Sequence, residues 1–253
     1  MRVTILGSGT GFPDAERFAP AVLVQTPDAL VLFDAGPGIL RRLAQAKVDP
    51  RQLDAVVLTH FHVDHCAGVP ELLFAFWHPR LLRSRPLSIW GGPGLSRWMG
   101  GLRTSWPKHT AGNGYELSEH ELDPGIHPIR DMRLDAIRVA HKPESLAFRV
   151  HGPSGEVLAL SGDSSPCEGL IACARAADLF LCECTTVTEL PAPSHLTARQ
   201  AGAAAACAGS RRLCLTHLGP DTVGVDIAAR AAEAYRGPIV VAHDLLELEI
   251  CAE

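Results

Sequence analysis

The stretch that decides the fold is "LTHFHVDHCAG", residues 58–68, which places three histidines and an aspartate within six residues. His60, His62, Asp64 and His65 come directly after the apolar run "DAVVL". Histidine is scarce in this chain, at 12 of 253 residues, so such a concentration calls for a chemical reason. An apolar strand followed by a loop rich in metal-binding side chains predicts a functional site at the edge of a sheet.

The local geometry of this segment allows its side chains to surround cations. The strand is expected to end at Thr59, and Asp64 or His65 is expected to open a helix. In an extended segment residues two apart point the same way, so His60 and His62 can hold one ion. Imidazole and carboxylate groups bind zinc-type ions at about 2.0–2.2 Å, and two ions about 3.5–4 Å apart would fit this loop. A run of surface histidines is the alternative, but four ligands at this spacing after a strand rarely arise by chance.

Three more predicted strands end at a residue that can bind a metal. "AIRVAH" ends at His141, "VLALSGDSS" contains Asp163 just past its strand, and "RLCLTH" ends at His217. Each alone would be interpreted as a polar loop residue. Together they form a convergent pattern, and we expect them to complete two coordination spheres, because one loop cannot supply enough ligands for two ions.

The composition is that of a globular protein with a sizeable core. Hydrophobic residues make up 47% of the chain and charged residues 20%, and the net charge of −5 gives no sign of a general nucleic-acid surface. No apolar run approaches the roughly 18 residues of a membrane span, and "MRVTILGSG" is too short for a secretory signal, so we expect a cytoplasmic protein. The cysteines form no CxxC pair and are expected to be free, buried thiols: Cys66, Cys167, Cys173, Cys182, Cys184, Cys207, Cys214 and Cys251.

Apolar runs of about five residues recur along the chain and predict strands, with helical patterns between many of them. Strands are expected at 2–6, 21–25, 30–34, 54–58, 87–90, 134–139, 146–150, 156–161, 178–182, 212–216, 238–242 and 246–250. Helices are expected at 37–47, 65–77, 167–176, 197–208 and 224–235. The pattern predicts a single domain, 1–253, of the α/β class: a four-layer αββα sandwich in which two mixed sheets are flanked by helices. Residues 78–130 are the least regular and are expected to form long loops over one face.

With these motifs in view, the chain resembles the metallo-β-lactamase superfamily. "THFHVDH" looks like its HxHxDH signature, and the later His, Asp and His follow in the family's order. Within the superfamily the chain is most similar to the ribonuclease Z and arylsulfatase-like phosphodiesterase branch. The stretches that look like motifs of that branch are "LGSGTGFPDAERFAPAVLV", "LFDAGPG", "SGDSS" and "HLTA" at 195–198. The resemblance implies a metallo-β-lactamase-like fold and a metal-dependent hydrolase.

The resemblance also implies how two divalent ions would be bound, with zinc expected and manganese or iron as substitutes. His60, His62 and His141 would hold one ion, Asp64, His65 and His217 would hold the other, and Asp163 would bridge them. Asp34 in "LFDAG" resembles the family's aspartate that orients ligands without binding metal. The alternative for Asp34 is a turn residue before Gly36.

The implied chemistry is hydrolysis by a hydroxide that bridges the two ions and attacks phosphorus or a carbonyl carbon. Asp64 would take up the nucleophile's proton, as the family resemblance suggests. His195, just before a predicted helix, would donate to a phosphoryl oxygen or protonate the leaving group rather than bind metal. A helix-start residue without chemistry is the alternative for His195, and Glu183 is either a helper or a plain carboxylate at a strand end. The other histidines are expected to be ordinary loop or surface residues.

The predicted function is a phosphodiesterase that acts on small phosphodiesters. Lactone, thioester or sulfate-ester hydrolysis and tRNA 3′-end cleavage are the alternatives on the same site. A β-lactamase is disfavoured by the branch and by the lack of a secretory signal. A non-catalytic metal-binding scaffold is disfavoured because all seven ligands are present, and an iron redox protein because the length leaves no room for a flavin domain.

The expected partner is a small ester rather than a nucleic acid or a membrane. Many ribonuclease Z chains carry a long basic arm before the bridging aspartate, whereas a hairpin and a tight loop fill that interval here. Gripping tRNA needs many basic contacts, and the short cluster Arg80, Arg83 and Arg85 is expected to be a solvated loop. A pocket under 78–130 is expected instead, with Trp90, Trp98 or Trp106 against the ligand. Analogy with relatives suggests a homodimer.

Overall fold

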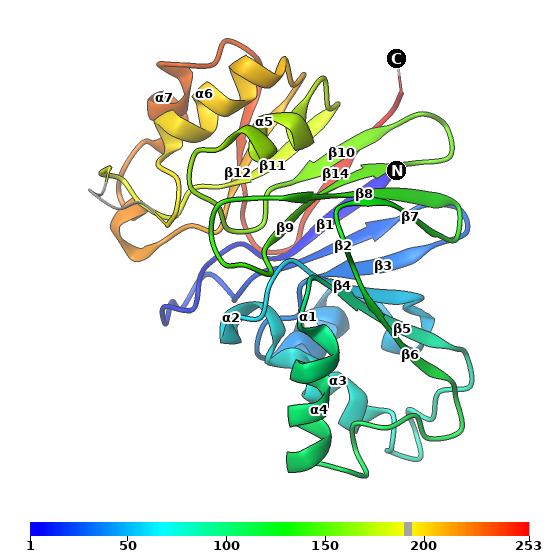
Figure 1. Cartoon of the computed structure of the whole chain (residues 1–253). Helices are drawn as coiled ribbons and strands as arrows, with labels where there is room; N and C mark the ends of the chain where they lie inside the picture. Colours follow the sequence, from blue (N-terminus) through cyan, green and yellow to red (C-terminus); the bar gives the residue numbers. More distant parts are fainter. Residues whose placement is uncertain (190–193, 253) are drawn as a thin grey trace.

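The computed structural model describes residues 1–189 and 194–252, within which two seven-stranded sheets pack face to face (Figure 1). The first sheet has the order β14 (Leu246–Glu249), β1 (Arg2–Gly7), β2 (Ala21–Gln25), β3 (Leu30–Phe33), β4 (Ala55–Leu58), β5 (Leu87–Gly91) and β6 (Leu117–Glu121). The second has the order β13 (Ile239–Val241), β12 (Leu213–Thr216), β11 (Leu179–Glu183), β10 (Val157–Leu160), β9 (Leu146–His151), β8 (Met132–Arg138) and β7 (Gly125–Ile129). Both sheets are mixed, because each is antiparallel on one side and parallel on the other.

Helices cover the outer face of each sheet. The first sheet is covered by α1 (Ile39–Gln45), α3 (Gly68–Ala75) and α4 (Leu95–Ser105), and the second by α5 (Glu168–Ala174), α6 (Ala198–Ala208) and α7 (Ile227–Ala232). The short α2 (Val63–Cys66) lies directly after β4, and single turns of 3-10 helix occur at Pro50–Gln52 and Pro220–Thr222. The four-layer αββα sandwich expected from the sequence is therefore confirmed.

Successive residues of the central strands belong to different cores, which explains why these strands are apolar throughout. Val57 of β4 packs between the two sheets, whereas Val56 and Leu58 pack against the helices of the first sheet. On the second sheet Leu181 faces the inter-sheet core and Cys182 faces the helices. A strand buried on both faces has no polar side, so its sequence is a continuous apolar run rather than an alternating one.

The strand expected at 87–90 is confirmed as β5, but the expectation of long loops over the rest of 78–130 was wrong, because this region also contains α4, β6 and β7. The helix α4 is obscured in the sequence by Gly100 and Gly101, which lower helix propensity, yet Leu95 and Met99 anchor it in the core. The strand β6 has the sequence "LSEHE" and lies at the edge of its sheet, where polar residues are tolerated. The helix expected over 65–77 is divided into α2 and α3.

Two expectations about side-chain exposure were also wrong. Arg83 is not a solvated loop residue: it is 2% exposed and donates to the backbone carbonyls of Arg85 at 2.7 Å and Arg51 at 2.9 Å. A guanidinium has five N–H donors, so it can satisfy a buried turn that would otherwise leave carbonyl groups unpaired. The cysteines are free, but Cys207 and Cys251 are exposed and Cys167 is half-buried. No helix among the described residues is long and apolar enough to cross a membrane.

Candidate metal centre

Seven side chains expected to bind metal gather where the two sheets meet. His60 and His62 lie on the connection between β4 and α2, and Asp64 and His65 belong to α2, which begins at Val63. His141 follows β8, Asp163 follows β10 and His217 follows β12. The parallel strands β10, β11 and β12 are neighbours, so the residues after them emerge at one edge of the sheet, where ligands of α/β proteins commonly bind.

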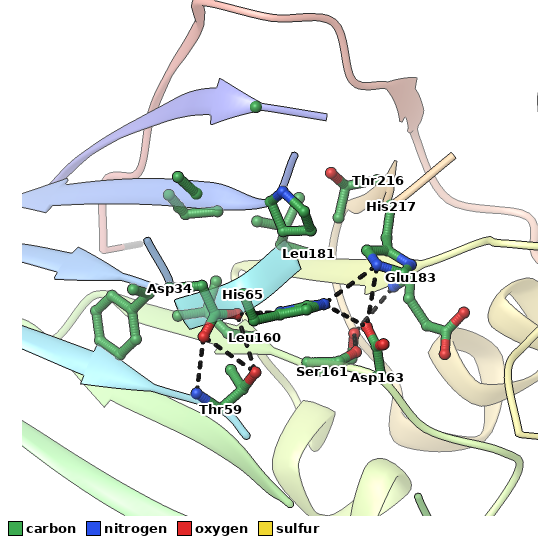
Figure 2. Close-up of a pocket in the computed structure, with 16 residues that line it drawn as sticks. Asp34, Thr59, His65, Leu160, Ser161, Asp163, Leu181, Glu183, Thr216 and His217 are labelled. Atoms are coloured by element: carbon green, nitrogen blue, oxygen red, sulfur yellow. Dashed lines mark hydrogen bonds and ion pairs between the residues drawn. The ribbon is translucent and has the colours of Figure 1, made fainter. Parts of the chain in front are cut away.

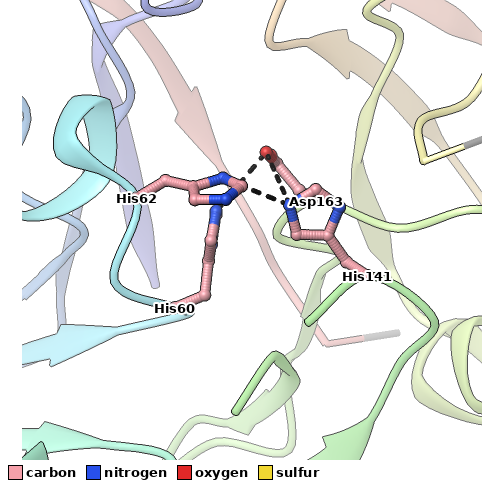
Figure 3. Close-up of side chains that lie close together, drawn as sticks. All are labelled: His60, His62, His141 and Asp163. Carbon is pink, nitrogen blue, oxygen red and sulfur yellow. Dashed lines mark hydrogen bonds and ion pairs between the residues drawn. The ribbon is translucent and has the colours of Figure 1, made fainter. Parts of the chain in front are cut away.

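The first group of side chains surrounds one oxygen of Asp163 (Figure 3). Asp163 Oδ2 lies 3.6 Å from His60 Nε2 and 3.8 Å from His141 Nε2. His62 Nδ1 lies 3.2 Å from His141 Nε2, so the three rings and the carboxylate face a common point.

The second group, Asp64, His65 and His217, lies beside the other oxygen of the same carboxylate, and Figure 2 shows His65 and His217 with Asp163. Asp163 Oδ1 lies 3.3 Å from His65 Nε2 and 3.4 Å from His217 Nε2. Asp64 Oδ2 lies 3.7 Å from His65 Nε2 and 3.6 Å from His217 Nε2. Asp163 therefore lies between two clusters and offers one oxygen to each.

These distances fit the residues to divalent cations. Ligand atoms that bind a tetrahedral ion at about 2.0–2.1 Å are themselves about 3.3 Å apart, which is close to the spacings within both groups. His60 Nε2 and Asp163 Oδ1 are buried and have no hydrogen-bond partner among the described residues, although buried polar atoms normally have one. A cluster of imidazole nitrogens and carboxylate oxygens with such unpaired atoms is suited to metal binding.

The electrostatics of the cluster lead to the same conclusion. Burial would raise the pKa of Asp163, but the facing His217 and His65 lower it well below its usual range. Burial would lower the pKa of His65, but Asp163 and Asp34 raise it well above its usual range. Burial and the nearby His65 lower the pKa of His60 to about 2. The buried carboxylate charge thus requires positive charge beside it, which a divalent cation can supply.

Hydrogen bonds behind the cluster fix which ring nitrogen faces inward. His65 Nδ1 donates to Asp34 Oδ2 at 2.8 Å, and His60 Nδ1 donates to Thr59 Oγ1 at 3.0 Å, which in turn donates to Asp34. His141 Nδ1 donates to the Ser194 carbonyl at 2.9 Å. These contacts leave Nε2 as the inward-facing atom, and Asp34 occupies the place that the family resemblance implied.

A second network is centred on Glu183, which is 1% exposed at the end of β11. Its carboxylate accepts from the Ser164 amide at 2.8 Å, the Leu196 amide at 3.1 Å and Thr185 Oγ1 at 2.7 Å. Thr185 Oγ1 in turn accepts from His217 Nδ1 at 2.7 Å. Glu183 therefore joins the loops that carry Asp163, His195 and His217. The sequence marked it as a carboxylate at a strand end, but nothing local identified Thr59, Ser164 or Thr185.

His195 lies at the rim of the cluster with 21% of its side chain exposed. Its Nδ1 donates to Glu183 Oε1 at 3.1 Å, which leaves Nε2 free. Burial would lower the pKa of His195, but the hydrogen bond and charge of Glu183 raise it. Asp163, His195 and His217 also have ligand atoms within 4.8 Å of one another, so the distances alone allow His195 either to bind metal or to contact a substrate.

The tryptophans expected near a ligand are dispersed. Trp98 stacks on Phe61, which lies between His60 and His62, with ring centroids 5.7 Å apart. Trp90 stacks on His120 at 4.0 Å, and Trp106 is half exposed. The cavity that adjoins Asp64 is lined by residues between 10 and 19 together with Pro37 and Val63. It therefore lies elsewhere than the pocket expected under residues 78–130.

Comparison with known proteins agrees with the geometry. Residues 30–218 match the family model described as the beta-lactamase superfamily domain. The chain is 34% identical to the uncharacterized protein ML1173 of Mycobacterium leprae over 98% of its own length and 89% of that protein. It is 30% identical to a ribonuclease Z of Mycobacterium bovis over 99% of its own length and 98% of that protein.

A solved structure shows the same arrangement of layers. The metallo-beta-lactamase fold protein YhfI from Bacillus subtilis superposes with a TM-score of 0.86 at 25% identity, covering 98% of each chain. The match of the family model covers most of the chain and includes every candidate ligand from His60 to His217. The chain thus belongs to the metallo-β-lactamase superfamily and is a hydrolase of that fold, with a His/Asp cluster suited to metal binding.

Proposed function

We propose that the protein is a phosphodiesterase that binds two divalent cations, preferably zinc, and hydrolyses small phosphodiesters. The observation that supports this proposal most is the position of Asp163, whose two oxygens face two separate groups of ligands. Two cations at such a site would act as Lewis acids and lower the pKa of water, which is the usual chemistry of paired metals on phosphate esters.

In this proposal the ligands divide as the two groups do. His60, His62 and His141 would hold one ion, Asp64, His65 and His217 would hold the other, and Asp163 would offer one oxygen to each. Asp34 and Thr59 keep the rings oriented through the hydrogen bonds behind them. Manganese or iron can replace zinc, because nitrogen and carboxylate ligands accept all three.

Two residues of the chain handle protons. Burial would raise the pKa of Asp64, but the neighbouring His217 and His65 lower it to about 2, so the side chain is an ionised carboxylate that can accept a hydrogen bond from water. His195 holds its Nδ1 on Glu183, which raises the pKa of the ring, so the protonated imidazolium carries a hydrogen on Nε2 that it can donate to the leaving group. Both are exposed enough to contact a substrate, at 19% for Asp64 and 21% for His195.

The surface favours a small substrate. The net charge is −5, and β9 and β10 are joined by a tight turn at Gly152–Gly155 rather than by a basic arm. The buried Arg83 further reduces the basic surface expected from the sequence. Binding a folded RNA depends on many lysine and arginine contacts with phosphates, and the chain has 23 such residues against 28 acidic ones.

A tRNA 3′-end endoribonuclease is the second candidate, because relatives named ribonuclease Z are 30% identical over almost the full length. Lactone, thioester and sulfate-ester hydrolysis would use the same cluster, and a substrate panel separates them from phosphodiester hydrolysis.

The deciding experiment is steady-state kinetics of the zinc-loaded protein, with an Asp163→Ala variant purified in parallel to reveal contaminating hydrolases. The panel contains bis(4-nitrophenyl) phosphate, a cyclic nucleotide, a precursor tRNA, a lactone, a thioester and an aryl sulfate. We expect turnover of the small diesters that disappears in the variant. Efficient cleavage of precursor tRNA without turnover of small diesters would favour the second candidate, and turnover confined to the other esters would refute the phosphodiesterase assignment.

A further inference from the structure

A cavity of about 350 Å³ opens beside the candidate catalytic carboxylate Asp64. The loop between β1 and β2 lines it with Thr10, Phe12, Pro13 and Phe18, and Val63 at the start of α2 lines it as well. Gly11 lies so close to Asp64 that a Cβ built on it would be 3.2 Å from the Asp64 Cβ atom. Asp64 thus belongs both to the wall of the cavity and to the candidate metal centre.

Two large apolar side chains in this cavity are turned toward solvent. Phe12 is 57% exposed and Val63 is 72% exposed, and both line the same space. Ligand pockets are typically apolar concavities of about 300–1,000 Å³ with a few polar groups, and this cavity fits that description. Exposed apolar residues that line a concavity next to a reactive site indicate contact with a ligand more strongly than isolated ones on a flat surface.

The loop that forms the wall is held in place before any ligand arrives. Asp244 accepts from the Ser8 amide at 2.9 Å and the Phe18 amide at 2.8 Å, at the two ends of the loop. The buried Arg42 pairs with Asp244 at 2.9 Å and lies 4.5 Å from the centre of the Phe18 ring. Arg17 NH1 donates to the Ala242 carbonyl at 2.7 Å. A preformed wall avoids the cost of ordering a loop on binding.

We propose that this cavity binds the non-leaving substituent of the phosphodiester and selects a planar aromatic ring in that position. The assignment depends on the proposed phosphodiesterase function, in which His195 serves the leaving group. His195 does not line the cavity but Asp64 does, so the substituent that stays on phosphorus occupies the Asp64 side. An aromatic ring suits the space, because it can pack on Phe12 and against Val63 while the phosphate lies at the metal centre. Aryl groups and nucleobases share this chemistry.

The test compares two diesters that release the same group. In bis(4-nitrophenyl) phosphate and methyl 4-nitrophenyl phosphate, water oxygen bonds to phosphorus and the bond to 4-nitrophenolate breaks in both. The two compounds differ in the substituent that remains, which is aryl in one and methyl in the other. Phe12→Ala should lower the ratio of kcat/KM for the aryl over the methyl compound by about 5-fold or more, the range for loss of one aromatic stacking partner.

Phe74→Ala is the matched control, because Phe74 is also 57% exposed but lies on α3 and does not line the cavity. This variant should leave the ratio unchanged. An unchanged ratio in Phe12→Ala, with both diesters still hydrolysed, would overturn the subsite while leaving the phosphodiesterase function in place.

A binding measurement tests the subsite without turnover. Calorimetry of the zinc-loaded wild type should show tighter binding of phenylphosphonate than of methylphosphonate, and Phe12→Ala should lose this preference. The proposal would be contradicted if the wild type bound the two phosphonates with equal affinity, or if it bound neither of them measurably. Absence of diester turnover together with a phenyl preference would instead count against the phosphodiesterase function alone.

Discussion

Replacing Asp34 with asparagine changes one atom and should disable one ligand of the metal centre. Asp34 Oδ2 accepts from His65 Nδ1 at 2.8 Å, so the ring carries its proton on Nδ1 and presents the bare Nε2 to the cluster. Asp34 Oδ1 is already used by the Thr59 amide at 2.8 Å, so the asparagine oxygen takes that role and its NH2 group faces His65. A donor facing Nδ1 favours the other tautomer, in which Nε2 carries hydrogen and cannot bind a metal ion.

The backbone should tolerate this change. Asp34 has a φ of 57°, in the left-handed region, which asparagine adopts as readily as aspartate. Loss of an outer partner of a ligating histidine typically lowers metal affinity by about 10- to 100-fold. Since each factor of ten corresponds to about 1.4 kcal/mol, the expected loss of binding free energy is about 1.4–2.8 kcal/mol. The loss should fall on the ion held by His65, because Asp34 contacts the other group only through Thr59.

The assay is competition for zinc against a chromophoric chelator, with metal content measured after dialysis. Asp54→Asn is the matched control: Asp54 is also a buried acceptor, bound to the Leu30 amide and to Arg85, but it precedes β4 at the end opposite the metal centre. The control should retain both metal affinities. If Asp34→Asn binds two zinc ions as tightly as the wild type, the hydrogen bond does not set the His65 tautomer and the reasoning is refuted.

Three further predictions concern the same centre. Elemental analysis of protein purified without chelator should approach two transition-metal ions per chain, and a folded protein that contains none and takes up no added zinc would disprove the metal centre. Asp163→Ala should lower both metal occupancy and diester hydrolysis by orders of magnitude, because each oxygen of Asp163 faces one ligand group; full activity with full occupancy would reduce Asp163 to a loop residue. His195→Ala should retain two ions yet lose about 10²-fold or more in kcat, the range for one proton or oxyanion donor; release of an ion instead would make His195 a ligand.

Much of the fold follows from local sequence, because burial on two faces leaves a clear apolar signature. The run "DAVVL" predicts β4 because Val56 and Val57 must both be buried, one in each of two cores. The signature weakens where a strand is at an edge or a helix contains glycine. The polar strand β6 and the helix α4 with Gly100 and Gly101 were missed for these reasons, and Arg83 was misplaced because a buried guanidinium looks like a surface one in sequence.

The candidate ligands were also identifiable from sequence, because each follows a predicted strand and four of them fall within six residues, 60–65. Only the tertiary structure decided how they meet. The two oxygens of Asp163 face histidines from positions 60 to 217, and Glu183 joins three loops through Ser164, Thr185 and Leu196. The wall beside Asp64 is likewise held by Asp244, more than two hundred positions away from Ser8. The spacing of residues along the chain predicts the strand or helix to which a side chain belongs. The partner of a buried carboxylate is instead set by how the two sheets pack. This packing depends on contacts between residues that are far apart in the sequence.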